Sequence, residues 1–152
     1  MINKIPKIAL TTGDPAGIGP DIIIQLAQFD YDAELVVIGD PDLLKDRARK
    51  LGLPLKLNNF NKDECGVKSK SGLLSFEKVP LKYDVNPGQP NIAHSGYVLE
   101  SLDKAIAYCL NKNLDALVTG PINKHSINTF LKSHQKSKKM IFTGHTEYLA
   151  EK

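Results

Sequence analysis

Short apolar runs alternate with amphipathic stretches along most of the chain. Runs rich in apolar and β-branched residues predict strands at 7–12, 34–39, 53–57, 73–79, 115–119 and 140–143. Apolar residues at helical spacing predict helices that begin near Pro20, Pro41, Ala93, Asn123 and Thr146. This alternation is typical of an α/β domain, and we expect an α/β/α sandwich with a mainly parallel sheet.

The boundaries of the second predicted helix are set by local chemistry. Asp40 is a suitable N-cap, and Pro41 suits the first turn because its missing N–H costs nothing there. Gly52 is a natural C-terminal stop. Residues 58–71 and 86–90 are rich in Asn, Gly, Pro and Ser, which predicts loops.

A glycine-rich turn, TTGDPAGIGPD, joins the first predicted strand to the first helix. Ligands of open α/β sheets bind beyond the carboxyl ends of strands, where a helix N-terminus offers free N–H groups. The glycine order is neither GxGxxG nor that of a phosphate-binding P-loop. Two interpretations stay open: a ligand-binding turn, or a tight turn without ligand contact in which Asp14 caps the turn.

Two later strand ends also place polar residues where a ligand could bind. Lys124 in TGPINK could bind an anionic group, or could be an exposed lysine at a helix start. In FTGHTE, His145 could form a hydrogen bond with a substrate oxygen, or be a structural histidine, and Thr146 could cap the last helix. Because right-handed crossovers align parallel strands, we expect all three loops at one rim of the sheet.

Composition narrows the possible partners. The 152 residues are 41% hydrophobic and 24% charged, which suits one sizeable core. The net charge of +3 is mild, and the basic run 132–139 is interpreted as a solvated loop. We expect no nucleic-acid partner, no membrane span and a cytoplasmic location. The four histidines show no HExxH-like spacing, so the sequence predicts no metal site in this chain.

The motifs TTGDPAGIGPD, TGPINK and FTGHTEYLAE, in this order, resemble the 4-hydroxythreonine-4-phosphate dehydrogenase family of vitamin B6 biosynthesis. The resemblance implies a two-domain α/β/α fold related to isocitrate and isopropylmalate dehydrogenases, working as a homodimer. It implies oxidation of 4-phosphooxy-L-threonine with NAD or NADP. The resulting 2-amino-3-oxo acid decarboxylates to 3-amino-2-oxopropyl phosphate. It also implies a divalent metal: zinc, magnesium or cobalt.

The resemblance assigns residues only where the motifs match. His145 and Thr146 match the pair with which the family binds substrate, and Lys124 is a weaker third candidate. The family's metal ligands have no counterpart up to residue 152, and catalytic and cofactor-binding residues stay unassigned. We therefore expect 1–152 to be a truncated, N-terminal α/β portion of a larger two-domain dehydrogenase. Alone, this chain is expected to be inactive and to bind no divalent metal tightly.

One segment departs from the family, and other functions stay open. FLKSHQKSKKMIF is longer and more basic than the family's usual link, which suggests an insertion or relaxed constraint in a degraded copy. One alternative is a sister dehydrogenase acting on D-threonate or D-erythronate 4-phosphate. Those relatives tend to have TAPINK, so Gly120 favours the B6 enzyme. The other alternative is a non-catalytic α/β fragment.

Overall fold

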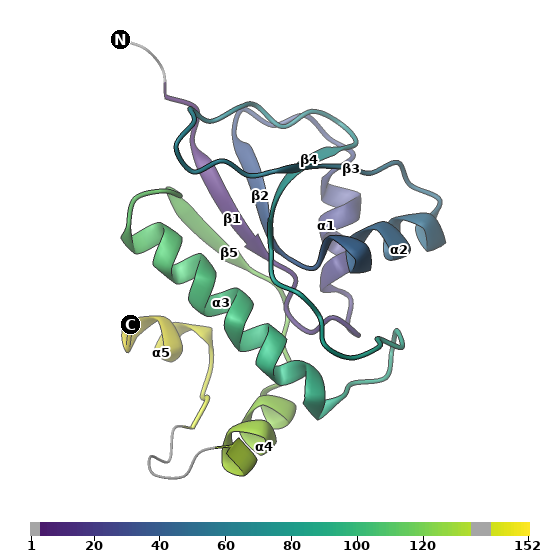
Figure 1. Ribbon diagram of the computed structural model, residues 1–152, viewed down its shortest axis with the longest axis vertical. Helices are drawn as coiled ribbons and strands as arrows, with labels where there is room; N and C mark the ends of the chain where they lie inside the picture. The colour runs from purple at the N-terminus through teal and green to yellow at the C-terminus, as the bar shows by residue number, and fades with distance from the viewer. Residues whose placement is uncertain (1–3, 135–140) are drawn as a thin grey trace.

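A computed structural model describes residues 4–134 and 141–152, and its centre is one parallel β-sheet (Figure 1). The strand order in the sheet is β3-β4-β2-β1-β5, and every neighbouring pair is parallel. The strands are Lys7–Thr11 (β1), Glu34–Gly39 (β2), Lys56–Asn59 (β3), Leu73–Lys78 (β4) and Ala116–Thr119 (β5). All carboxyl ends therefore meet at one edge.

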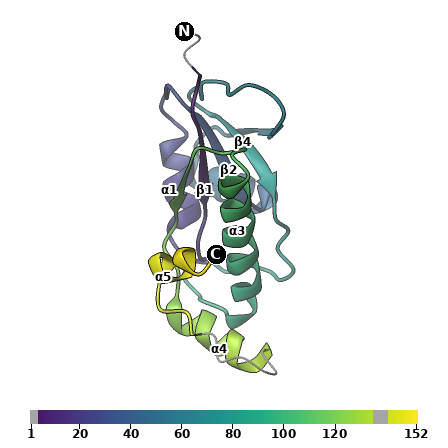
Figure 2. The same cartoon turned by 90° about the vertical axis from the view of Figure 1, so that its left-hand side faces the viewer.

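Helices cover both faces of the sheet. They are Gly19–Leu26 (α1), Pro41–Leu51 (α2), the 3₁₀ turn Ile92–His94 (η1), Ser95–Leu110 (α3), Lys124–His134 (α4) and His145–Ala150 (α5). Figure 2 shows the sheet nearly edge-on, with α1 on one side and α3 on the other. The predicted α/β/α sandwich with a parallel sheet is confirmed. None of the helices in the described ranges is both long and apolar enough to cross a bilayer.

The central strand β2 divides the core into two layers. Val36 and Ile38 pack toward α3, whereas Leu35 and Val37 pack toward α1 and α2. All six residues of β2 are buried, because both faces of the strand are covered. The α3 layer also receives α4 and α5, through Ile127, Leu131, Phe142 and Tyr148 among others.

The predicted boundaries of α2 are confirmed. The Asp40 side chain accepts hydrogen bonds from the backbone N–H groups of Asp42 and Leu43, at 2.8 and 3.1 Å. Gly52 ends the helix with φ of 66°, a left-handed conformation that costs glycine little. The strand expected at 53–57 instead begins at Lys56. The reason is that Leu53 N–H still donates to Ala48 O and closes the helix end.

The strand predicted at 140–143 is wrong for its described residues. Residues 141–144 form no regular element, and the backbone of Phe142 pairs with the side chain of Asn128 rather than with a strand. Met140 lies outside the described residues. The basic run 132–139 begins as the last turn of α4 rather than as a loop, and its positions 135–139 also lie outside the described residues.

Candidate functional site

The loops after β1 and β5 flank a reversal in the strand order. β1 pairs with β2 on one side and with β5 on the other, so the chain leaves the centre of the sheet in both directions. In open α/β sheets, ligands bind beyond the carboxyl ends of the strands at such a switch point. A ligand site is therefore expected between residues 12–19 and 120–124.

These two loops touch through their backbones. Asp14 N–H donates to Pro121 O at 2.9 Å, and Gly120 N–H donates to Thr11 O at 2.9 Å. A Cβ at Gly13 would lie 2.1 Å from Pro121 O, and a Cβ at Gly120 would lie 2.5 Å from Thr11 O. The glycines thus permit this close approach, as the tight-turn interpretation predicts.

Asp14 has the turn-capping role that its sequence position predicts. Its Oδ1 accepts a hydrogen bond from the backbone N–H of Ala16 at 3.0 Å. The residue is only half-buried, so its carboxylate also borders an open pocket of about 360 Å³ beside the turn. The lining comprises Asp14, Gly17, Ile18, Pro121, Ile122, Asn123 and Lys124. The turn is therefore tight and capped by Asp14, and it also lines a pocket; that it binds a ligand stays a prediction.

The start of α4 forms the other wall of this pocket. Asn123 Oδ1 accepts the backbone N–H of Ser126 at 3.0 Å, which caps the helix. Lys124, the first residue of α4, is exposed and brings a cation to the pocket wall. A helix N-terminus beside a lysine favours an anionic group. Asn123 was not singled out from the sequence, although an asparagine at the predicted start of a helix is a usable N-cap pattern.

The third loop approaches the same lysine. A Cβ built on Gly144 would lie 3.4 Å from Lys124 Nζ, so the turn before α5 passes close to the lysine side chain. His145 is half-buried and Thr146 exposed. Burial, and then the neighbouring Lys124 cation, lower the pKa of His145 below its ordinary value. The three loops do gather at one rim, and at neutral pH they present a neutral histidine beside a lysine.

Buried polar contacts hold the rim from below. The hydroxyls of Thr12 and Tyr97 are 2.9 Å apart, and Tyr97 Oη accepts the backbone N–H of Asp40 at 3.2 Å. Burial raises the pKa of Tyr97, so it stays a neutral phenol. Tyr97 thus ties α3 to the ends of β1 and β2. The sequence did not identify it, because nothing in a helical apolar stripe distinguishes a tyrosine with this role.

A partly buried ion pair holds the glycine-rich turn from the other side. Arg47 on α2 bonds to both carboxylate oxygens of Asp21 on α1, at 2.7 and 2.5 Å. The same guanidinium donates to Gly17 O at 3.0 Å. The Arg47 side chain is only 7% exposed. It therefore fixes the far end of the turn relative to both helices.

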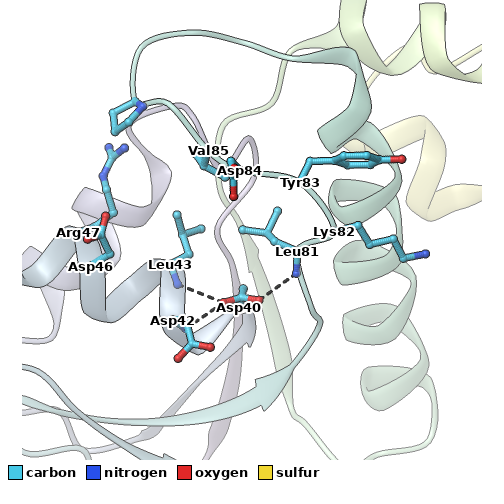
Figure 3. Close-up of a pocket in the computed structure, with 11 residues that line it drawn as sticks. Asp40, Asp42, Leu43, Asp46, Arg47, Leu81, Lys82, Tyr83, Asp84 and Val85 are labelled. Atoms are coloured by element: carbon cyan, nitrogen blue, oxygen red, sulfur yellow. Dashed lines mark hydrogen bonds between the residues drawn. The ribbon is translucent and has the colours of Figure 1, made fainter.

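A second pocket of about 370 Å³ lies beyond β2 and β4 (Figure 3). In dinucleotide-binding folds an acidic residue beyond the glycine-rich turn binds the adenosine ribose. Here the Asp40 carboxylate accepts backbone N–H groups from Asp42, Leu43 and Leu81 instead. With no GxGxxG turn either, the described residues do not form a recognisable dinucleotide site.

The described residues also do not fit a metal. Within 4–134 and 141–152 no three or more His, Cys, Asp or Glu residues are grouped so that they could hold an ion. His94 is buried, with Nε2 3.0 Å from Asp84 O. His134 stacks on Phe130 with ring centroids 4.1 Å apart. His94 and His134 thus have structural contacts, His125 is exposed in the first turn of α4, and His145 is half-buried in the loop that passes close to Lys124.

Comparisons with known proteins agree with one another. The family model described as "Pyridoxal phosphate biosynthetic protein PdxA" matches residues 31–152. A 4-hydroxythreonine-4-phosphate dehydrogenase of Thioalkalivibrio sulfidiphilus is 43% identical over 147 residues, covering 97% of this chain and 42% of the relative. One of Erwinia tasmaniensis is 41% identical over 152 residues, covering 100% of this chain and 43% of the relative.

Comparison with a solved structure shows that the similarity extends from the sequence to the fold. The crystal structure of 4-hydroxythreonine-4-phosphate dehydrogenase from Klebsiella pneumoniae matches with a TM-score of 0.78 and 25% identity. The match covers 96% of this chain and 44% of that one. The chain therefore spans less than half the length of the relatives that it matches.

Proposed function

The chain belongs to the PdxA family of pyridoxal phosphate biosynthetic proteins, and on this premise we propose that it forms the substrate-binding N-terminal portion of a 4-hydroxythreonine-4-phosphate dehydrogenase. The complete enzyme oxidises 4-phosphooxy-L-threonine with NAD or NADP, and the product decarboxylates to 3-amino-2-oxopropyl phosphate. The observation behind the proposal is that Lys124 lines the pocket at the switch point and that the loop carrying His145 and Thr146 passes close to the Lys124 side chain.

The chemistry of these three side chains suits a phosphorylated hydroxy acid. Lys124 supplies a positive charge for an anionic group. His145 is held neutral by burial and by Lys124, so one ring nitrogen can donate a hydrogen bond while the other accepts one. Thr146, in the first turn of α5, adds a hydroxyl and a helix-start N–H. Together they bind and orient the substrate.

The remaining parts of the proposal concern the complete enzyme. It takes NAD or NADP and a divalent metal such as zinc, magnesium or cobalt, with the metal ligands outside residues 1–152. It works as a cytoplasmic homodimer of two-domain subunits. We assign no step to the cofactor or the metal in this chain, since the described residues do not fit either group.

Gly120 gives a reason to prefer this substrate over the sister sugar-acid phosphates. Dehydrogenases of that kind tend to have alanine in this position of the motif. Here an alanine Cβ would lie 2.5 Å from Thr11 O and 2.6 Å from Thr12 O. The ends of β1 and β5 would have to move apart, and the pocket between their loops would change shape. The glycine therefore supports the B6 substrate.

A chimaera tests the proposal: this chain followed by the remainder of the Erwinia tasmaniensis relative. We expect it to oxidise 4-phosphooxy-L-threonine in preference to D-threonate and D-erythronate 4-phosphates. The change His145→Ala should lower kcat/KM tenfold or more, on the order of 1.4 kcal/mol, because a substrate contact is lost. NAD(P)H absorbance follows the reaction for each substrate.

His125→Ala is the matched control, since His125 is exposed on α4 and should leave kcat/KM unchanged. If His145→Ala keeps full kcat/KM but lowers the melting temperature by several degrees, His145 is structural and the assignment is wrong. A preference for a sugar-acid phosphate would instead favour the sister dehydrogenase.

A further inference from the structure

The backbone just before the His145 loop is paired with a side chain. Phe142 N–H donates to Asn128 Oδ1 at 2.8 Å, and Asn128 Nδ2 donates to Phe142 O at 3.0 Å. The amide thus satisfies both polar backbone groups of one residue, as a neighbouring strand would in a sheet. Asn128 lies in the second turn of α4. The helix therefore fixes the backbone of Phe142, which lies 14 positions after Asn128 in the sequence.

The residue held in this way is the anchor of the loop. Phe142 is 2% exposed and belongs to the α3 core layer. Its ring meets the His145 ring edge-on, with centroids 6.1 Å apart, and lies 5.3 Å from the Tyr148 ring. Only Thr143 and Gly144 separate Phe142 from His145. Fixing the backbone of Phe142 therefore restricts the positions that His145 can take next to Lys124.

The same helix contacts the loop a second time. Lys124 and Asn128 are four residues apart on α4, which places them on one face of the helix. Asn128 holds the chain before the turn, while Lys124 Nζ lies close to Gly144 within it. A helix turn thus sets the distance between the cation and the histidine. Among residues 4–134 and 141–152, Glu147 also brings a charge to this turn, since its Oε2 approaches Gly144.

We propose that Asn128 is the positioning residue of this site: it holds residues 142–146 so that His145 and Thr146 face the substrate beside Lys124. The proposal rests on the function proposed above, because positioning matters only if these residues bind the substrate. Binding groups must be held to within about 0.5 Å of a productive geometry, and supporting hydrogen bonds provide that precision. Asn128 itself does not touch the substrate.

Two uncharged variants test the proposal in the 152-residue chain. Asn128→Ala and Asn128→Leu remove both hydrogen bonds without adding a charge that would itself shift the titration of His145. We expect the Phe142 amide to exchange with solvent at least tenfold faster than in the wild type. We also expect the pKa of His145 to rise toward 6.5, as the ring leaves its half-buried place near Lys124. Both are measured by NMR, with His145→Gln assigning the histidine signal.

Thr129→Ala is the matched control, since its hydroxyl donates to His125 O within α4 and does not hold the 142–146 loop in the described structure. It should leave both readouts unchanged. In the chimaera, the Asn128 variants should lower kcat/KM at least tenfold, and Thr129→Ala should not. Asn128→Leu keeps most of the side-chain volume. It therefore tests the positioning role of Asn128 even if Asn128→Ala does not fold.

The NMR measurement separates this proposal from the one on which it rests. If His145→Ala proves harmless to activity, the proposed function of His145 fails, yet the titration still reports whether Asn128 holds the loop. If both Asn128 variants keep the wild-type pKa of His145 and the wild-type kcat/KM, the positioning role is wrong.

Discussion

The sheet with α1, α2 and α3 and the segment from α4 to α5 are held by different kinds of interaction. In the first region, parallel strand pairing and two apolar layers determine the structure, and β2 is buried along its whole length. In the described part of the second region, side chains pair with backbone, as in Asn123 with Ser126 and Asn128 with Phe142. Polar side chains at the rim come mainly from this second region, which the sheet does not constrain directly.

This difference shows which interactions position the side chains of the proposed site. In residues 141–152 only Phe142, Gly144 and Tyr148 are buried. Tyr148 ties α5 to α3 by donating its hydroxyl proton to Asp103 at 2.7 Å. With little apolar area to bury, this segment depends on a few directional hydrogen bonds. It should therefore open more readily than the sheet, as binding loops commonly do.

The largest expected effect lies where the two regions meet, at Gly120. Replacing it with alanine should destabilise the chain by roughly 3 kcal/mol or more, because the new Cβ would press on the backbone of Thr11 and Thr12. Urea denaturation followed by circular dichroism measures the change. Gly88→Ala is the control: its Cβ meets no atom within 4 Å, and its φ of 78° alone should cost about 1 kcal/mol.

An equal loss in the two glycine variants would show that the β1 and β5 ends can separate freely. In that case the tight approach between the two loops would not define the pocket. A large loss for Gly120→Ala alone would confirm that the backbones fix the rim.

A smaller effect should distinguish the two regions directly. Leu74→Ala, in the sheet core, should lower the free energy of global unfolding by about 2–5 kcal/mol. Phe142→Ala removes a larger buried side chain but should cost less globally, about 1–2 kcal/mol. The loss of global stability cannot exceed the free energy needed to unfold residues 141–150 locally from the rest of the chain. Hydrogen exchange should show that only the amides of that segment lose protection.

If Phe142→Ala destabilises the chain as much as Leu74→Ala, with amides of β1 and β2 exposed together with those of α5, the two regions unfold as one. The comparison would then be wrong, and the site would be as rigid as the sheet.

Much of the first region could be predicted from the sequence, because local chemistry and burial agree there. Asp40 and Gly52 bound α2 as their residue types indicate, and the apolar runs at 7–12 and 34–39 became central strands. The start of β3 was misplaced, because Leu53 closes the helix before it. A pattern of apolar residues does not reveal that a backbone N–H is already bonded to the preceding helix.

The second region was harder to predict because its partners are distant in sequence. The strand propensity of 141–143 was overridden by the amide of Asn128, which no periodicity reveals. Lys124 could be placed at the rim from the parallel topology, because it follows β5, but His145 reaches Lys124 through a loop that follows no strand among the described residues. Tyr97, which joins Thr12 and Asp40, could not, since its partners lie 85 and 57 residues away. Motif order identified the rim residues, but only the structure reveals what supports them.

The smallest expected effect is the pH dependence that His145 gives to stability. Its pKa is lowered in the folded chain, first by burial and then by Lys124, whereas the unfolded chain has the ordinary value near 6.5. Below about pH 6.5 the unfolded state therefore binds more protons, so the free energy of unfolding falls as the pH drops through the folded pKa. Above that range His145 is neutral in both states and has no effect.

Melting temperatures of the wild type and His145→Gln at pH 7.5 and 5.5 isolate this contribution, since the other histidines are common to both proteins. The wild type should lose more stability on acidification than His145→Gln. Equal losses would show that His145 titrates as a solvated side chain, freely enough that the segment from α4 to α5 does not hold it. The loop would then need substrate to order it, and the hydrogen bonds of Asn128 and Tyr148 would not be enough to fix this part of the rim.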